Sequence, residues 1–243
     1  MKITVITPLV SPTPPGETDP REQARLADSA DFGIDIDFRY ITRGPASIEG
    51  EYEDAMAIPD TVRVALEAES AGAHAILINC TADTGLIACR EALSIPVVAP
   101  TMSTFFLAAQ LSHKFSVLTF LERVNQRFEQ MAWHWGLEHK LASVRSVEIP
   151  VLSLAQDRDD LIHDLVQASQ ACYEVDGAHG VILGCTDFED VADQVEAELR
   201  QKKLPLVIFR PYRIALQTEI LLVNLKIAQS KLSFPKPKQY LGI

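Results

Sequence analysis

An internal repeat is the feature that most constrains the fold of this chain. The segment AHAILINCTAD, Ala73–Asp83, returns as AHGVILGCTDF, Ala178–Phe188, at an offset of 105 residues. Ala, His, Cys and Thr are identical at matched positions, and the residues between them are small or aliphatic in both copies. Repetition at a fixed spacing indicates two structural units built to one plan.

Two further segments repeat in the same order. KITVITP at Lys2–Pro8 resembles KFSVLTF at Lys114–Phe120, and IPVVAP at Ile95–Pro100 resembles LPLVIF at Leu204–Phe209, at offsets of 112 and 109. Loop insertions and deletions would produce such small differences. The sequence therefore predicts two copies of one unit, joined near residues 101–113.

Each copy alternates short runs of Val, Ile and Leu with longer segments of helical spacing, which is typical of a parallel sheet covered on both faces. The expected strands are Ile3–Thr7, Ile34–Tyr40, Ala75–Asn79, Val97–Ala99, Phe115–Thr119, Ala142–Glu148, Gly180–Leu183 and Leu206–Phe209. The expected helices are Thr61–Ala71, Thr84–Ala92, Arg123–Trp135, Asp159–Glu174, Phe188–Gln201 and Tyr212–Ser230, with an irregular segment at Ile41–Met56. The predicted fold class is α/β, with two similar lobes related by pseudo-twofold symmetry. Residues 1–100 with 210–243 form the first lobe and its C-terminal helix, and residues 101–209 form the second.

Composition excludes several classes of partner. The formal net charge of −11, from 22 Lys and Arg against 33 Asp and Glu, argues against nucleic acid, which needs clustered cations. No apolar run reaches the length of a membrane span and the first residues lack signal-peptide features, so we expect a cytoplasmic protein without a membrane partner. The four cysteines form no C-x-x-C pair, which favours free thiols over a zinc site or disulfides, and no metal site is predicted.

Two of the four cysteines occupy matched positions in the repeat. Cys89 and Cys172 lie within helical patterns, where a buried cysteine behaves as a small apolar residue. Cys80 and Cys185 instead follow buried strands and precede turns that open helices, where backbone N–H groups stabilise a thiolate. A thiol pKa of about 8.5 needs only a moderate downward shift to serve as an acid or base near neutral pH.

Two like acid/base groups are what a racemase requires, because a proton leaves one face of a stereocentre and another arrives at the opposite face. If the two halves face each other across a pseudo-twofold axis, Cys80 and Cys185 point into one cleft. The sequence therefore predicts that Cys80 and Cys185 move a proton at a carbon next to a carbonyl.

The developing enolate also needs fixed hydrogen-bond donors. The candidate substrate-binding residues are Thr7, Asn79, Thr81, Thr119, Gly184 and Thr186. The matched His74 and His179 begin their strands, far from the cysteines, and are interpreted as structural. Asp83 and Asp187 are interpreted as helix N-caps.

The motifs around the cysteines resemble those of the aspartate/glutamate/hydantoin racemase superfamily. NCTADTGL around Cys80 and LGCTDF around Cys185 carry the resemblance, and GPASIEGEYEDA at Gly44–Ala55 with FSVLTFLERV is similar to the hydantoin and allantoin racemase branch. The resemblance implies a two-lobed α/β fold, an active site in the cleft between the lobes, no cofactor, Cys80 and Cys185 as opposed acid/base residues, and a homo-oligomer.

Several alternatives remain open for the substrate and the reaction. A 5-substituted hydantoin or related cyclic ureide is the first choice of small-molecule substrate. A free acidic amino acid is the second, because GCTD after the second repeat looks closer to the acidic amino-acid racemases. A cis–trans isomerase of an unsaturated diacid also uses two cysteines, whereas a single-cysteine decarboxylase is disfavoured. A small-molecule binding protein without turnover is the non-enzyme alternative.

Overall fold

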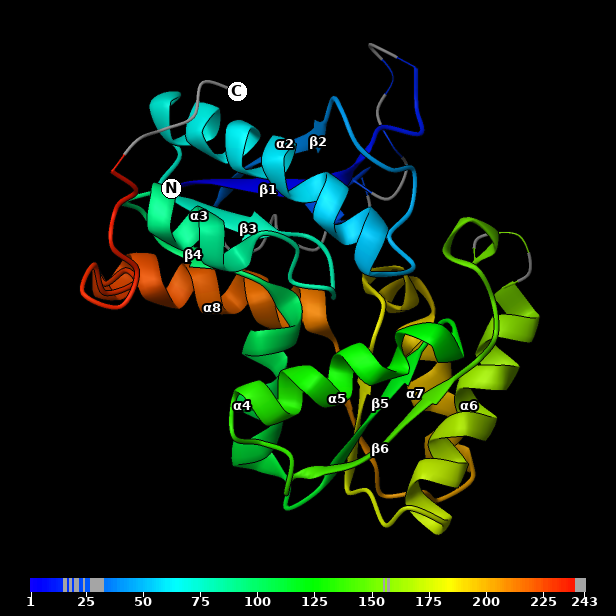
Figure 1. Ribbon diagram of the computed structural model, residues 1–243. Helices are drawn as coiled ribbons and strands as arrows, with labels where there is room; N and C mark the ends of the chain where they lie inside the picture. Colours follow the sequence, from blue (N-terminus) through cyan, green and yellow to red (C-terminus); the bar gives the residue numbers. More distant parts are fainter. Residues whose placement is uncertain are drawn as a thin grey trace. The chain divides into compact units, whose positions relative to one another are not determined.

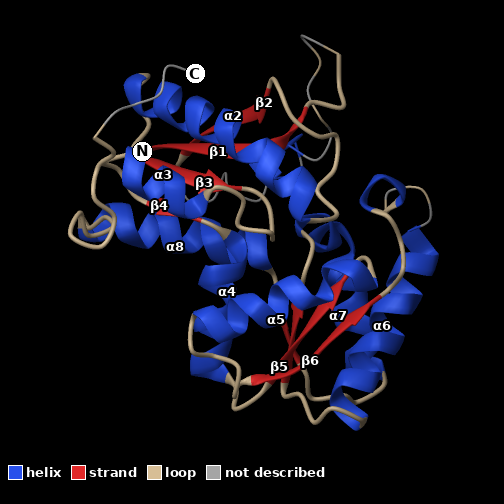
Figure 2. Cartoon of the chain, in the orientation of Figure 1, coloured by secondary structure: helices blue, strands red, loops and turns tan. Residues whose placement is uncertain are grey.

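A computed structural model describes residues 1–14, 17, 19, 22–23, 25–26, 33–154, 156 and 158–238 of the 243-residue chain. Figure 1 traces the chain and Figure 2 separates its helices, strands and loops. The strands are β1 (Lys2–Val10), β2 (Asp35–Ile41), β3 (Ala75–Ile78), β4 (Val97–Val98), β5 (Phe115–Thr119), β6 (Leu141–Ser146), β7 (Gly180–Leu183) and β8 (Val207–Phe209). The α-helices are α2 (Glu51–Ser70), α3 (Leu86–Ala92), α4 (Pro100–Leu111), α5 (Asn125–His134), α6 (Arg158–Glu174), α7 (Ala192–Gln201) and α8 (Pro211–Leu225). Short 3-10 helices are η2 (Glu122–Val124), η3 (Val151–Ser153) and η4 (Thr186–Val191).

The strands form two four-stranded sheets of identical plan, which confirms the predicted α/β class. Their orders are β2-β1-β3-β4 and β6-β5-β7-β8, and every neighbouring pair is parallel. The chain divides into two compact units, residues 1–99 with 215–243 and residues 100–214. Among the described residues, no helix has the length and apolar character needed to cross a membrane.

The register of the central strands follows the sequence repeat. Ile3 lies opposite Ala75 in the first sheet, and Phe115 lies opposite Gly180 in the second. These pairs reproduce the offsets of 112 and 105. The strands β3 and β7 are buried along their whole length, because helices cover both faces of each sheet.

The structure shifts the last pair of repeated segments by two residues relative to the sequence alignment. Val97 lies opposite Ile76, and Ile208 lies opposite Val181, so Val97 corresponds to Ile208 at an offset of 111 rather than 109. Both strands are then followed by a proline that begins a helix, Pro100 or Pro211. Short aliphatic runs resemble one another after a slip of two residues, which explains the error.

The sequence predicts a connection at residues 101–113, whereas the structure has helix α4 at Pro100–Leu111. It follows the last strand of the first unit but belongs to the second, where Phe105 is fully buried. The ring of Phe105 lies 5.1 Å from that of Phe115 and 5.6 Å from that of Trp135. Helix α8 follows the last strand of the second unit, and from Ala215 onward it belongs to the first. Each unit thus contributes the helix that follows its sheet to the other unit.

Helix α2 begins ten residues earlier than predicted. It runs from Glu51 through the expected start at Thr61, with Pro59 inside it, and Gly50 is its N-cap. Glu51, Glu53 and Asp54 lie in its first turn, where acidic side chains interact favourably with the positive end of the helix dipole. The segment interpreted as irregular therefore supplies the first turns of this helix.

A buried glutamate attaches α8 to strand β4. Glu219 has no exposed surface, and its Oε1 accepts a hydrogen bond from the backbone N–H of Val98 at 2.9 Å. Its Oε2 is buried without a hydrogen-bond partner among the described residues. Burial raises the pKa of the Glu219 carboxyl well above its ordinary value of 4.5, so the folded protein holds this group protonated as the pH rises.

Glu219→Gln is expected to make the protein more stable than the parent at neutral and mildly alkaline pH. The unfolded carboxyl loses its proton near pH 4.5, whereas the folded one keeps it, so the parent loses stability as pH rises from 4.5 towards the folded pKa. Glutamine keeps the acceptor for Val98 and does not titrate. The advantage of the variant should be absent below pH 4.5 and grow by up to about 1.4 kcal/mol per pH unit above it.

Urea unfolding at a series of pH values measures this difference. Glu129→Gln is the matched control, because it makes the same substitution at an exposed position on α5. A stability difference between Glu219→Gln and the parent that does not vary with pH would contradict the assignment of a protonated Glu219.

Candidate active site

The two repeated cysteines lie at equivalent places in the two sheets. Cys80 follows the end of β3 by two residues, and Cys185 follows the end of β7 by two residues. Cys80 is half-buried and Cys185 is buried, and all four cysteines are free of disulfide bonds. Both thiols therefore lie at the carboxyl edge of a parallel sheet, which is where open α/β sheets bind ligands.

The turns after the two cysteines differ. Cys185 is the N-cap of η4, and its carbonyl accepts the N–H of Phe188 at 3.1 Å. After Cys80 the chain makes a turn in which the N–H of Asp83 donates to the Cys80 carbonyl at 2.9 Å, and α3 begins only at Leu86. Each cysteine thus precedes a turn that opens a helix, as predicted, and the helix begins further from Cys80 than from Cys185.

The expectation that Asp83 and Asp187 are N-caps is wrong. Gly85 with φ 73° is the N-cap of α3, and Cys185 is that of η4. Asp83 instead adopts φ 52° inside the turn, a left-handed conformation that aspartate tolerates better than most residues. Asp187 lies in the first turn of η4.

A buried hydrogen bond links this turn to helix α2. The Thr84 hydroxyl donates to Asp54 Oδ1 at 2.6 Å, and both residues are buried. Asp54 belongs to the segment Gly44–Ala55, and Thr84 belongs to the NCTADTGL motif, so the bond joins the two motifs noted in the sequence. Sequence reasoning did not identify either residue, because nothing in the pattern indicates that they meet.

Asn79 and Thr7 lie together in the first unit. Asn79 Nδ2 donates to Thr7 Oγ1 at 3.2 Å, and the Asn79 backbone N–H donates to the carbonyl of Ile6 at 2.7 Å. Thr7 is partly exposed, although β1 continues beyond it to Val10 after a shift in register. The Thr7 hydroxyl accepts from Asn79 and donates to no other residue in the described part of the chain, so its proton can be donated to a ligand.

The matched threonine of the second unit has a different environment. Thr119 has no exposed surface, and its hydroxyl donates to Asn125 Oδ1 at 2.5 Å. The side chain of Thr119 is thus enclosed, whereas that of Thr7 is partly exposed. Asn125 begins α5, is partly exposed, and lies beside the end of β5 through its bond with Thr119.

Gly184 stands where the first unit has Asn79. Its N–H donates to the carbonyl of Leu118 at 2.6 Å, and a Cβ added to Gly184 would lie 2.6 Å from that oxygen. Glycine is therefore required for the close approach of β7 to β5, and its amide is engaged within the sheet. Gly184 thus has a packing role between the two strands, and its role towards substrate stays a prediction.

The remaining predicted residues are placed as follows. Thr81 and Thr186, directly after the cysteines, are both buried. His74 and His179 lie at the amino ends of β3 and β7, away from the thiols. The backbone N–H of His74 donates to the carbonyl of Lys2, and that of His179 donates to the carbonyl of Lys114.

The two other cysteines are poor acid/base groups. Burial raises the pKa of the Cys89 thiol to about 12. Burial also raises the pKa of the Cys172 thiol, against smaller opposing effects from hydrogen bonds with Ser116 and Ser143. Both groups are thus held as thiols at neutral pH. Among the residues that the structure describes, no three His, Cys, Asp or Glu side chains form a group that could hold a metal ion.

Comparison with known proteins identifies the family. The family model described as Asp/Glu/Hydantoin racemase matches residues 22–217. The chain belongs to this family. It is 31% identical over 202 residues to a hydantoin racemase from Pseudomonas sp. (strain NS671), covering 82% of this chain and 79% of that protein. We conclude that the protein is a racemase of this family.

Solved structures confirm the fold. The allantoin racemase from Klebsiella pneumoniae matches with a TM-score of 0.85 at 23% identity, covering 99% of this chain and 96% of the other. The allantoin racemase AllR from Pseudomonas fluorescens matches with a TM-score of 0.84 at 24% identity, covering both chains completely. At these identities the likeness establishes the α/β fold.

Replacing Thr84 by Val should destabilise the racemase by about 1–3 kcal/mol, because the buried Asp54 carboxyl loses the hydroxyl that donates to it. The turn that follows Cys80 should also be less well held, so turnover should fall. Thr84→Ser keeps the hydroxyl and is expected to retain most of both properties. Urea unfolding and initial rates on the two variants test the bond, and equal behaviour of Val and Ser at this position would contradict it.

Proposed function

We propose that this racemase uses Cys80 and Cys185 as a pair of acid/base groups, without a cofactor, on a carbon next to a carbonyl. The observation that supports the pair most strongly is their equivalence: each thiol lies two residues beyond the end of the matched strand, β3 or β7. Duplicated units that present the same group from the same place in each sheet suit a reaction that needs the same chemistry on both faces of one carbon.

The proposed reaction is a balanced exchange of protons. One cysteine, as thiolate, removes the proton from one face of the carbon and becomes a thiol, and the electron pair moves onto the carbonyl oxygen as an enolate. The other cysteine, as thiol, donates its proton to the opposite face and becomes a thiolate. The opposite enantiomer reacts with the two roles exchanged, and the free enzyme then needs one proton transfer through solvent to reset.

The enolate oxygen requires hydrogen-bond donors in either direction. Thr81 and Thr186 directly follow the two thiols and are the proposed donors at the reacting carbonyl. Thr7 is proposed to donate its free hydroxyl proton to a second acceptor on the substrate, with Asn79 holding it through the 3.2 Å bond. Asn125 is proposed to donate through Nδ2, because its Oδ1 already accepts from Thr119.

The proposed substrate is a 5-substituted hydantoin or related cyclic ureide. Such a ring presents carbonyl oxygens separated by N–H groups, and the polar groups proposed to contact it donate to carbonyls. The relatives named above, a hydantoin racemase and two allantoin racemases, support this choice over a free acidic amino acid. Parallel assays with enantiopure hydantoins and with aspartate and glutamate separate the two substrate classes.

Cys80→Ala and Cys185→Ala should each reduce racemisation by at least about 100-fold while the protein stays folded, because proton delivery needs both faces. Cys89→Ala is the matched control: it removes a buried thiol of the same kind and should keep most of the activity. Polarimetry on an enantiopure hydantoin measures the rates. Retention of full activity in either of the first two variants would refute the two-thiol mechanism.

The serine variants give a sharper signature. In deuterated water, Cys80→Ser and Cys185→Ser should each still exchange the α-proton of one enantiomer, and the two variants should prefer opposite enantiomers. The reason is that the remaining thiolate removes a proton only from its own face. The same enantiomeric preference in both variants would show that the two thiols do not act on opposite faces.

A further inference from the structure

Two polar side chains beside Cys80, the Asn79–Thr7 pair, have hydrogen-bonding groups that the protein itself does not use. Asn79 Oδ1 is buried and has no hydrogen-bond partner among the described residues. The Thr7 hydroxyl accepts from Asn79 Nδ2 at 3.2 Å and donates to no residue in the described part of the chain. A buried acceptor without a partner costs about 1–3 kcal/mol, so its presence at this place needs an explanation.

The backbone fixes the Asn79–Thr7 pair at the carboxyl edge of the first sheet. The Asn79 N–H donates to the carbonyl of Ile6 at 2.7 Å, and the Cys80 N–H donates to that of Ile78 at 3.0 Å. Thr7 is partly exposed, whereas Asn79 is 5% exposed. Because the backbone N–H groups of Asn79 and Cys80 are both engaged, the side chains of the pair carry the groups that remain for a ligand.

The Asn79–Thr7 pair offers a donor and an acceptor whichever way the amide is turned. In the observed orientation Thr7 offers its O–H and Asn79 offers Oδ1. With the amide turned over, Thr7 donates to Oδ1, and the pair offers an N–H of Asn79 and a lone pair of the Thr7 oxygen, because a hydroxyl both donates and accepts. A ligand that satisfies the pair therefore has an acceptor and a donor side by side, as a carbonyl and an adjacent N–H do.

The second unit has no counterpart of this pair among its described residues. Gly184 stands at the position of Asn79 and has no side chain, and the hydroxyl of Thr119, which matches Thr7, donates to Asn125. The thiols are matched between the units, as proton transfer on two faces requires, whereas the Asn79–Thr7 pair occurs once. A feature that occurs once suits recognition of a substrate ring better than acid/base chemistry, because the ring presents each of its edges once.

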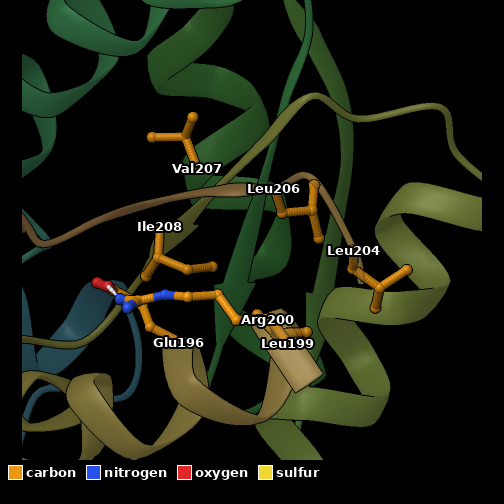
Figure 3. Close-up of a pocket in the computed structure, with 7 residues that line it drawn as sticks. All are labelled: Glu196, Leu199, Arg200, Leu204, Leu206, Val207 and Ile208. Carbon is orange, nitrogen blue, oxygen red and sulfur yellow. Dashed lines mark hydrogen bonds and ion pairs between the residues drawn. The ribbon is translucent and has the colours of Figure 1, made fainter. Parts of the chain in front are cut away.

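A pocket in the second unit has a different character. Figure 3 shows this pocket beside β8 and the end of α7, lined by Glu196, Arg200 and five leucine, valine and isoleucine side chains. Arg200 donates to Glu196 at 2.9 Å, so the two charged residues of the lining pair with each other. The Asn79–Thr7 pair differs from this pocket in that its groups are left for a ligand.

We propose that the Asn79–Thr7 pair binds the ring N–H next to the reacting carbon, together with the carbonyl that follows it, an inference that rests on the proposed function and deepens it. Around the ring of a 5-substituted hydantoin, the groups follow as second carbonyl, N–H, reacting carbon and reacting carbonyl. At the edge of the sheet the side chains follow in the same order, as Thr7, Asn79, Cys80 and Thr81. Thr7 then donates to the second carbonyl, and Asn79 Oδ1 accepts from the N–H. Cys80 acts at the reacting carbon, and Thr81 donates to the reacting carbonyl.

A ring with oxygen in place of this N–H tests the recognition on the parent enzyme. A 5-substituted oxazolidine-2,4-dione keeps the ring shape, both carbonyls and the reacting C–H, but it leaves Asn79 Oδ1 facing a lone pair. Sites built to bond an N–H reject an analogue that lacks it, because the protein acceptor stays unpaired. We expect kcat/KM for the oxazolidinedione to be at least about 10-fold below that for the matching hydantoin, each value being divided by the uncatalysed rate of racemisation.

Asn79→Leu tests the residue itself, with polarimetry on both rings. The variant removes the acceptor, so the preference for the hydantoin should fall by about 10-fold or more, whereas a merely structural role of Asn79 would lower both rates by one factor and leave their ratio unchanged. Asn79→Asp keeps an acceptor at this place and should keep the preference. Asn224→Leu is the matched control, because it makes the same substitution at an exposed asparagine on α8 and should leave both rates unchanged.

The outcomes separate this inference from the function on which it rests. A substrate ratio that is unchanged in Asn79→Leu would overturn the inference, and so would a parent enzyme that uses both rings equally well. The two-thiol function survives either result as long as Cys80→Ala and Cys185→Ala fail to racemise the hydantoin. A parent enzyme that racemises no hydantoin would overturn the proposed substrate and this inference together. The comparison of the two rings on the parent enzyme needs no variant, so it remains decisive if Asn79→Leu does not fold.

Discussion

The parallel pairing of each central strand with the strand two positions later in the chain is the constraint on which the site depends. Ile3 opposite Ala75 and Phe115 opposite Gly180 set the same register in both sheets. With that register fixed, the residues that follow β3 and β7 emerge at the same level of each sheet. The two thiols are equivalent because these backbone ladders are equivalent, and a slip by one residue in either sheet would direct every side chain of its strand to the opposite face.

The sequence was sufficient for the features that repeat locally. The matched cysteines, the central strands and the α/β class all follow from aliphatic runs of the correct length, and the observed bounds of β5 and β7 agree with the expected ones. The sequence does not predict helix α4, because the helix packs against residues outside its own segment. Its Phe105 is buried against Phe115 and Trp135, and the segment has no strong polar face that would mark it as a surface helix. The slip between β4 and β8 arose because aliphatic runs of two or three residues do not define a register by themselves.

Residues that match in the sequence repeat do not all have matching environments in the site. Thr7 and Thr119 are matched, yet one hydroxyl accepts from Asn79 and the other donates to Asn125. The difference follows from a single position: Gly184 stands where the first unit has Asn79, because β7 approaches Leu118 too closely for a side chain. Such an asymmetry suits a substrate whose two ends differ, even though the reaction at its stereocentre needs similar groups on both faces. Neither the enclosure of Thr119 nor the bond between Asp54 and Thr84 could be predicted, because both depend on contacts between segments that the sequence does not relate.

The central claim is that two thiols act from opposite faces of one carbon, and the isotopic course of the parent enzyme's first turnovers tests it most directly. An enantiopure 5-substituted hydantoin is incubated with the enzyme in deuterated water, and the reaction is stopped at low conversion. The substrate and product enantiomers are then separated, and the deuterium content of each is measured by mass spectrometry. A sample without enzyme is the control. The two-thiol account predicts that the product carries one deuterium while the recovered substrate carries almost none, since the group that donates the proton is never the group that removed it. Product that retains the original proton, or deuterium that accumulates equally in recovered substrate and product, would contradict the account.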